Sequence, residues 1–273
     1  MKEKYFDTWD DFLEFANALL NDADYRGKSG HHDKPLFRGH ADASWKLETS
    51  LERYIKNNPK GYYNDAKFLC KSYHDEMDIA VKTVNTVASV ALRDDAYKEP
   101  SNARDIPENL STMAWLRQNG FPSPLLDWSR SPYIASFFAY AEADLNRSNL
   151  VSIYTFIETI TGSRLSTRQA DSSYISSMPP WLKTDKKHFL QQSAYTMSRC
   201  EINEKYFYSS HEEALVNENP EDQEQMIFEK CILPANEKIS VLRRLRRMNI
   251  TRYSLFETTP ALLATVADDL FTT

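Results

Sequence analysis

The sequence predicts an α+β fold, in which helices and strands follow one another irregularly. Apolar residues recur at helical spacing in several segments that carry helix start signals. Between them lie short apolar or β-branched runs that end at glycine, proline or polar residues, as strands do. The order of these segments does not follow the strand–helix–strand repeat of a doubly wound sheet, so α+β is favoured over α/β.

Length and composition fit one domain over residues 1–273, with hydrophobic residues making up 41% of the chain. The net charge of -6 argues against a protein that coats nucleic acid, because that role needs an excess of Lys and Arg. The sequence shows no apolar leader and no membrane-spanning run, and its three cysteines lack zinc or disulfide spacing. We therefore expect a cytoplasmic protein with no membrane contact.

The glycines and histidines exclude further classes of site. None of the six glycines belongs to a GxGxxG or GxxxxGK[ST] motif, so a Rossmann or Walker phosphate loop is excluded. The six histidines show no ligand spacing, and the adjacent His31 and His32 would point apart. No metal site is expected.

The first half of the chain predicts three helices and a strand. Thr8 and Asp11 form a capping box before a helix whose apolar face consists of Trp9, Phe12, Leu13, Ala16, Leu19 and Leu20. Residues 35–39 predict a short strand that ends at a glycine. Helical periodicity returns from residue 64 to about 84, and again from 108 to 119, where Gly120 is placed to stop the helix.

The segment 122–141 predicts a strand, a tight turn and a helix within a few residues. Leu125–Trp128 is too short for a helix and is bounded by prolines and polar residues, so a buried strand with Asp127 near its end is favoured. Ser131 and Pro132 are typical of an N-cap and a first helical position. Such turns often carry functional groups.

The second half predicts strands at 150–157, 193–198 and 225–233, with a loop over 162–180. A basic helix follows, with Leu242, Leu245 and Met248 facing inward and the arginines between 243 and 247 facing mostly outward. Thr259 and Pro260 begin the last helix.

Two blocks carry a family resemblance. Residues 36–39 (LFRG) with 43–47 (ASWKL), and residues 115–129 (WLRQNGFPSPLLDWS), are similar to the two main blocks of the FRG domain, a prokaryotic family named for Phe-Arg-Gly. The pairs at 191–192 and 194–195 and the segment 239–256 resemble its later blocks. The sequence departs from the family where Gln118 replaces a histidine and Ser193 a glycine.

A more distant resemblance is to ADP-ribosyltransferases. It implies a split β-sheet core with a helical insertion, residues 55–110, between the first two core strands. In that family an arginine holds the NAD phosphates, a serine supports the nicotinamide end and a late glutamate stabilises the sugar cation. Here Arg38 and Ser129 take the first two positions, glutamines stand at the third, and Asp127 is the best substitute carboxylate, with Glu201 and Glu229 behind it.

The resemblance therefore implies a set of site residues. The expected catalytic residues are Arg38, Asp127 and Gln192, and the expected NAD-binding residues are Phe37, Arg38, Gly39, His40, Trp128, Ser129 and Gln191. Each also has a structural reading: Arg38 could pair with Asp127, Trp128 could be core, and the glutamines could be solvated.

Two functions stay open at this point. One is an NAD-dependent ADP-ribosyltransferase or NAD glycohydrolase, which in a bacterial protein would suit a toxin or an antiviral defence effector. The other is a non-catalytic interaction module that binds a protein or nucleic acid through the same cleft, as the missing glutamate suggests. The target macromolecule and the oligomeric state are left open.

Overall fold

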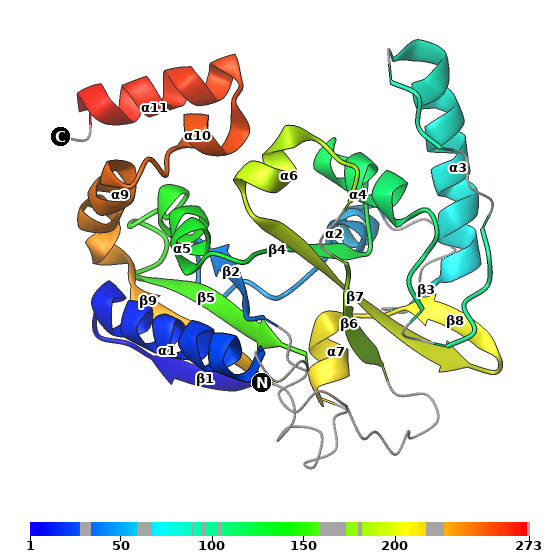
Figure 1. Ribbon diagram of the computed structural model, residues 1–273, viewed down its shortest axis with the longest axis horizontal. Helices are drawn as coiled ribbons and strands as arrows, with labels where there is room; N and C mark the ends of the chain where they lie inside the picture. The colour runs from blue at the N-terminus through cyan, green and yellow to red at the C-terminus, as the bar shows by residue number, and fades with distance from the viewer. Residues whose placement is uncertain are drawn as a thin grey trace.

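The computed structural model describes residues 1–27, 34–58, 67–88, 90–93, 97–102, 105–158, 173–179, 182–216 and 227–271. Figure 1 shows these residues as a mixed sheet with helices packed around it. The fold is α+β, as the sequence predicts, and the sheet is open and mixed. No helix among the described residues is long and apolar enough to cross a membrane.

Within the described ranges, nine strands form the sheet. They are β1 (Lys2–Tyr5), β2 (Leu36–His40), β3 (Phe68–Leu69), β4 (Leu125–Ser129), β5 (Leu150–Ile157), β6 (Tyr174–Ser177), β7 (Ser193–Ile202), β8 (Lys205–Tyr208) and β9 (Ile227–Pro234). The spatial order is β1-β9-β5-β2-β4-β7-β8-β3, with β6 paired to β7. Every pairing is antiparallel except that of β1 with β9.

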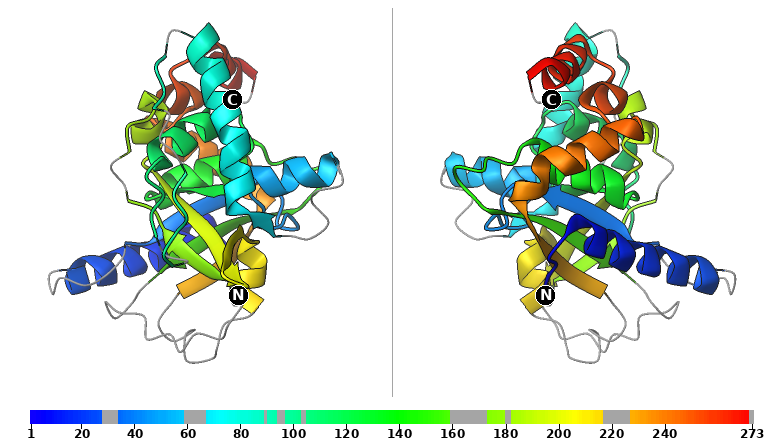
Figure 2. Two further views of the ribbon diagram at one scale, coloured as in Figure 1. Left: turned by 90° about the vertical axis from the view of Figure 1, so that its right-hand side faces the viewer. Right: turned by 90° about the vertical axis from the view of Figure 1, so that its left-hand side faces the viewer.

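The helices connect and cover these strands. They are α1 (Trp9–Gly27), α2 (Ser50–Asn57), α3 (Cys70–Val87), α4 (Leu110–Gln118), α5 (Pro132–Ala141), α6 (Lys186–Leu190), α7 (His211–Val216), a short 3₁₀ helix at Ala235–Glu237, α9 (Lys238–Arg247), α10 (Arg252–Phe256) and α11 (Thr259–Phe271). Figure 2 shows α1 running out beyond the strands that it packs against. In Figure 1, α3 and the α9–α11 group lie at opposite ends of the molecule.

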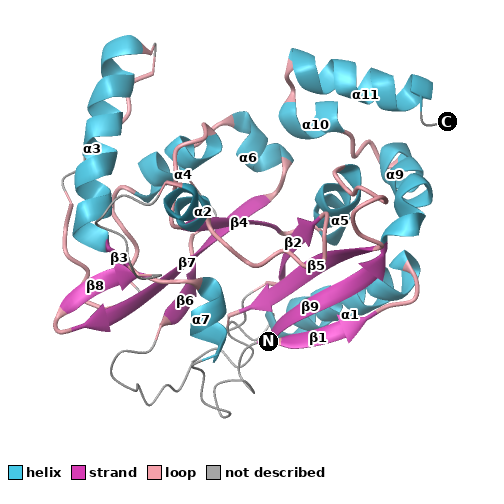
Figure 3. Cartoon of the chain, turned by 180° about the vertical axis from the view of Figure 1, so that it is seen from behind, coloured by secondary structure: helices cyan, strands magenta, loops and turns pink. Residues whose placement is uncertain are grey.

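Two core clusters each pack on one half of the sheet, and a third, which includes Leu36, Trp128 and Phe156, spans both halves. One cluster packs α1, α5 and α9 on β2, β5 and β9, and another packs α3 and α4 on β7 and β8. Between the halves, β2 and β4 are paired at one position only, Phe37 opposite Ser129. Figure 3 shows the two groups of strands diverging on either side of this junction. The junction is where the candidate site lies.

Several predicted elements are confirmed with their start signals. The Asp11 backbone N–H donates to Thr8 Oγ1 at 3.2 Å and the Thr8 N–H donates back to the Asp11 carboxylate, so the capping box is present. The Ile134 N–H donates to Ser131 Oγ at 3.3 Å at the start of α5. Gly120 follows α4 with a φ of 93°, a conformation that favours glycine.

Other predictions are corrected. The helix predicted from residue 64 begins at Cys70, because Phe68 and Leu69 pair with β8 instead; residues 59–66 lie outside the described part. The predicted loop over 162–180 contains β6, which pairs with β7, while residues 159–172 and 180 are not described. Met248 is 49% exposed at the end of α9, and Val241 takes the inward place beside Leu245.

The segment predicted as a helical insertion, residues 55–110, holds the end of α2, β3 and α3. Its strand β3 pairs with β8, so this segment contributes to the edge of the sheet as well as to a helical layer.

Candidate functional site

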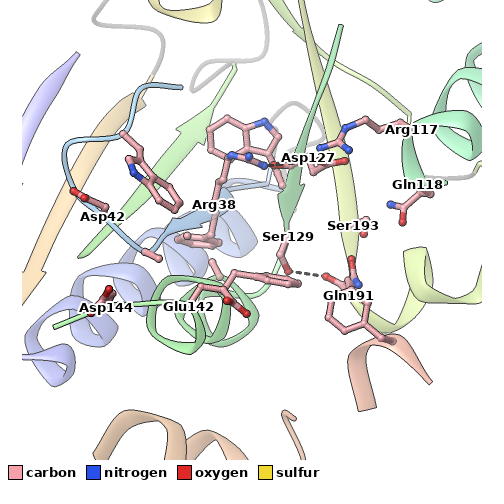
Figure 4. A pocket seen from close by; sticks show the side chains of 18 of the residues that line it. Arg38, Asp42, Arg117, Gln118, Asp127, Ser129, Glu142, Asp144, Gln191 and Ser193 are labelled. Carbon is pink, nitrogen blue, oxygen red and sulfur yellow. Dashed lines mark hydrogen bonds and ion pairs between the residues drawn. The ribbon is translucent and has the colours of Figure 1, made fainter. Parts of the chain in front are cut away.

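A cavity of about 530 Å³ opens where β2 and β4 separate. Its walls come from the ends of β2, β4 and β7, the last turn of α4, the inner face of α5 and the loops after β2 and α5. The lining residues are Phe37, Arg38, Gly39, Ala41, Asp42, Trp45, Arg117, Gln118, Asp127, Trp128, Ser129, Ala135, Phe138, Glu142, Asp144, Arg147, Ser148, Gln191, Ser193 and Phe256. Figure 4 shows the polar members of this set around the opening.

Arg38 spans the gap between β2 and β4. Its Nη1 donates to the Asp127 carbonyl oxygen at 2.6 Å and lies 3.9 Å from the Asp127 carboxylate. The side chain is 17% exposed. Burial lowers the pKa of Arg38 to about 10, an effect that Asp127 opposes and Arg117 strengthens, so the group is a cation at neutral pH.

His40 lies behind Arg38. The Arg38 Nε–H donates to His40 Nε2 at 3.1 Å. Burial, reinforced by the charge of Arg38, lowers the pKa of His40 to about 3, so the imidazole is neutral and can accept this bond. His40 is expected from the resemblance to bind NAD, but the structure places it outside the lining of the cavity, where it orients the guanidinium.

Asp127 lies between two arginines. Arg117 Nη2 donates to Asp127 Oδ2, and Arg38 approaches the same oxygen from β2. The Asp127 side chain is 29% exposed and the Arg117 side chain 19%. Arg117 is a site residue that the sequence interpretation missed. Its place in the last turn of a helix leading into β4 is the signal that could have identified it.

Ser129 and Gln191 join the ends of β4 and β7. The Ser129 hydroxyl donates to the Gln191 carbonyl oxygen at 2.8 Å, drawn as a dashed line in Figure 4, and accepts the Ser131 N–H at 3.1 Å. The Gln191 side chain donates to the Leu255 carbonyl oxygen at 3.1 Å. Both residues line the cavity, and both also anchor the strand ends.

Gln192 occupies a left-handed turn. Its φ is 48°, its side chain is exposed, and its carbonyl oxygen accepts the Arg130 N–H at 3.0 Å. Of the described residues, Gln191 and Ser193 line the cavity at this turn and Gln192 does not. The structure therefore brings together Arg38, Asp127 and Ser129, with Gln191 in the place expected for Gln192.

The model of the FRG domain family matches residues 33–148. The chain contains an FRG domain. The match runs from just before β2 to the loop before β5, so it includes Arg38, Arg117, Asp127 and Ser129. No curated protein and no solved structure matches the chain.

The three residues that give the FRG domain its name have different roles here. Phe37 is fully buried in the core beneath the cavity, and Arg38 crosses to β4. A Cβ atom on Gly39 would lie 2.6 Å from the Ala139 nitrogen and closer still to the Ala135 carbonyl oxygen. Glycine is therefore required for α5 to lie directly against β2, and this packing forms one wall of the cavity.

Trp128 is a core residue of the FRG domain. Its indole N–H donates to Thr196 Oγ1 at 2.8 Å, and its ring packs on Phe156 and Phe228 at centroid distances of 5.8 and 6.0 Å. The side chain is 3% exposed, so only its edge reaches the cavity. The structural reading of Trp128 is confirmed.

The remaining carboxylates divide into two groups. Glu201, at the far end of β7, accepts the Tyr206 hydroxyl at 3.1 Å, and neither Glu201 nor Glu229 lines the cavity. Asp42, Glu142 and Asp144 do line it, and Figure 4 shows Asp42 and Asp144 on the side opposite Arg117. No group of three or more His, Cys, Asp or Glu among the described residues could hold a metal ion.

Proposed function

We propose that this FRG domain binds NAD, or a related nucleotide that contains a diphosphate, in the cavity. We propose further that it transfers the ADP-ribose group of NAD to a target or releases it by hydrolysis of the nicotinamide bond. One observation carries the proposal: Arg38 and Arg117 reach the same wall of the cavity from two different elements, held on either side of Asp127. Guanidinium groups fixed in this way suit the oxygens of a diphosphate.

The hydrogen bonds of Arg38 leave one nitrogen of its guanidinium group, Nη2, available to a ligand. Its Nε–H is directed to His40 and its Nη1 to Asp127, while no described residue accepts from Nη2. A ligand oxygen can bind there without displacing the contacts that hold the side chain. The cavity therefore presents a positioned cation at low cost in conformational entropy.

The other walls offer surfaces for the rings of a dinucleotide. Trp45 is 48% exposed, and Phe138 and Phe256 line the cavity beside the α5 wall. Aromatic side chains stack on bases without requiring a particular sequence of hydrogen bonds. Ser129 and Gln191 line the same cavity as the arginines and can offer polar groups to a ribose.

Cleavage of the nicotinamide bond leaves positive charge on the ribose, which a carboxylate can stabilise. Asp127 is the carboxylate nearest the arginines; Asp42 lies on the side opposite Arg117, and Glu142, which also lines the cavity, is paired with Arg252. If Asp127 has this role, Asp127→Asn should abolish nicotinamide release while NAD still binds. Release is measured by chromatography of NAD incubated with the purified protein, with and without cell lysate.

Calorimetry with NAD, ADP-ribose and AMP tests the binding step. Arg38→Gln and Arg117→Gln should each weaken binding of the two diphosphates by about 10- to 100-fold, the loss expected for a charged hydrogen bond. Arg243→Gln is the matched control, because Arg243 is exposed on α9, outside this cavity. The proposal fails if neither NAD nor ADP-ribose binds the wild-type protein at about 1 mM.

A second candidate function is a non-catalytic module that binds its ligand in the same cavity. The ion pairs of Asp127 favour it, because two nearby cations already compensate its charge. If the domain is such a module, Arg38→Gln weakens ligand binding, and neither the wild-type protein nor any variant releases nicotinamide. Asp127→Asn then affects ligand binding only by changing the positions of the arginines. Binding of ADP-ribose without any turnover of NAD would select this function.

A further inference from the structure

Arg199 is a buried cation that forms no ion pair in the described part of the chain. It lies on β7, between β6 and β8, and is 2% exposed. Its Nη2 donates to the Asp105 carbonyl oxygen, its Nε has no hydrogen-bond partner, and it forms no ion pair with any described carboxylate.

Such an arrangement is costly without a ligand. Burying a guanidinium group is unfavourable unless charge and hydrogen bonds compensate it, so buried arginines normally face an anion. Arg38 in the first cavity follows this rule through Asp127. Arg199 has one neutral carbonyl partner instead.

A second cavity, of about 360 Å³, lies against Arg199. It is enclosed by the first turns of α3, the segment that leads into α4, and β7 and β8. Its lining residues are Cys70, His74, Tyr97, Lys98, Glu99, Pro100, Ser101, Asp105, Ile106, Pro107, Glu108, Asn109, Arg199 and Tyr208. None of these residues lines the first cavity.

A fixed hydrogen-bond chain runs beside Arg199. The Asn109 side-chain amide donates to His74 Nδ1 at 3.0 Å, and His74 Nε2 lies 2.9 Å from the Tyr208 hydroxyl oxygen. Burial, with the charge of Arg199, lowers the pKa of His74 to about 4, so the ring is neutral and its one proton is on Nε2. The His74 Nε2–H therefore donates a hydrogen bond to the Tyr208 oxygen, and this bond does not use the hydrogen of the Tyr208 hydroxyl.

The outer part of the same cavity is acidic. Glu99 and Glu108 are exposed there, and Lys98 pairs with Glu108 at 2.7 Å, whereas Glu99 forms no ion pair among the described residues. A buried cation inside and a carboxylate at the mouth match a ligand with the opposite charges at its two ends.

We propose that this cavity is a second ligand site, which takes a small zwitterion of the amino-acid class with its carboxylate on Arg199 and Tyr208 and its ammonium group toward Glu99. A guanidinium fork binds a carboxylate through two parallel hydrogen bonds, which fixes the orientation of the ligand. A multiply charged phosphate is disfavoured by Glu99, and an uncharged ligand leaves Arg199 uncompensated. The proposal does not depend on NAD binding in the first cavity.

Thermal unfolding with single amino acids, acetate and inorganic phosphate at about 10 mM tests the site, because a ligand that binds only the folded state raises the melting temperature. At least one amino acid should stabilise the wild-type protein more than acetate or phosphate does. Arg199→Met should remove this shift, and calorimetry should show a loss of affinity of about tenfold or more. Arg243→Met, at an exposed position outside this cavity, should keep the shift.

Glu99→Gln keeps the inference testable if Arg199→Met does not fold, because Glu99 is exposed. This substitution should weaken binding of the amino acid while leaving binding of acetate unchanged. The proposal is overturned if no amino acid stabilises the wild-type protein, if phosphate or acetate binds as well as the best amino acid, or if Glu99→Gln leaves amino-acid binding unchanged.

Discussion

Asp127 lies between the guanidinium groups of Arg38 and Arg117, and this position limits its chemistry. A carboxylate already paired with two cations has less negative potential to offer to a developing sugar cation. It does, however, hold both arginines toward the cavity from two separate elements. Whether the domain is an enzyme or a binding module therefore depends on how much of the negative charge of Asp127 remains available to a ligand.

Two glycines give a matched test of backbone packing. Gly39→Ala places a Cβ against the backbone of α5, which cannot move aside as a side chain can. It should lower the free energy of unfolding by about 3 kcal/mol, at the upper end of the range for overpacking. Gly120→Ala meets no atom within 4 Å and should cost only about 1 kcal/mol, through its φ of 93°. Urea unfolding measures the loss of unfolding free energy in each variant. A loss for Gly39→Ala that is no larger than that for Gly120→Ala contradicts the packing argument.

His40 predicts how stability depends on pH. Its pKa is lowered from 6.5 to about 3 in the folded protein, so the unfolded chain binds the extra proton between these values. The free energy of unfolding should therefore fall as the pH drops below about 6.5, by at most about 1.4 kcal/mol per pH unit for this residue. Buried His74 and His211, with pKa values of about 4 and 3, act in the same direction.

Substitution of His40 isolates its contribution to the pH dependence of stability. His40→Gln keeps an acceptor for Arg38 and removes the titration, so the slope of stability against pH between about 6.5 and 4 should become shallower. Urea unfolding at several pH values measures the slope. The same slope in wild-type protein and variant would show that His40 is not buried in its neutral form.

At the scale of single elements, α5 depends on its first turn. Ser131 caps the helix, Pro132 occupies its first position, and the helix carries Phe138 into the cavity. Ser131→Ala should cost about 1 kcal/mol of stability, whereas Ser131→Asp should keep most of it because aspartate is also a good cap. Thermal unfolding of the two variants gives the comparison, and equal losses would contradict a capping role.

Other elements show where local patterns are insufficient. The periodicity that predicts a helix from residue 64 runs through Phe68 and Leu69, yet these residues form β3 because β8 lies beside them. In α9 the sequence predicts Met248 as an inward residue, but the helix ends there and the side chain is left exposed. An apolar residue fits a strand or a helix end equally well until its neighbours are known.

At the scale of the whole molecule, the two cavities lie on two halves of one sheet. The first opens at the junction of β2 and β4, where pairing is reduced to one position. The second lies at the other half, over β7 and β8. Strand β7 joins them, since Ser193 at its start lines the first cavity and Arg199 further along lines the second. Each cavity is lined by an arginine with little exposure: Arg38 lies beside the Asp127 carboxylate, and Arg199 forms no ion pair with any described residue.

The sequence alone determined the α+β class, the main helices and strands, and the first-cavity residues Arg38, Asp127 and Ser129, because periodicity, caps and the Phe-Arg-Gly and Leu-Leu-Asp-Trp blocks are local signals. Only the tertiary structure decided that Arg117 pairs with Asp127, that Gln191 takes the place expected for Gln192, and that His40 lies behind Arg38. It also decided that Arg199 is buried beside a second cavity. These facts depend on strand pairing and burial between segments far apart in the chain, and electrostatic effects in a protein follow from such distances rather than from sequence spacing.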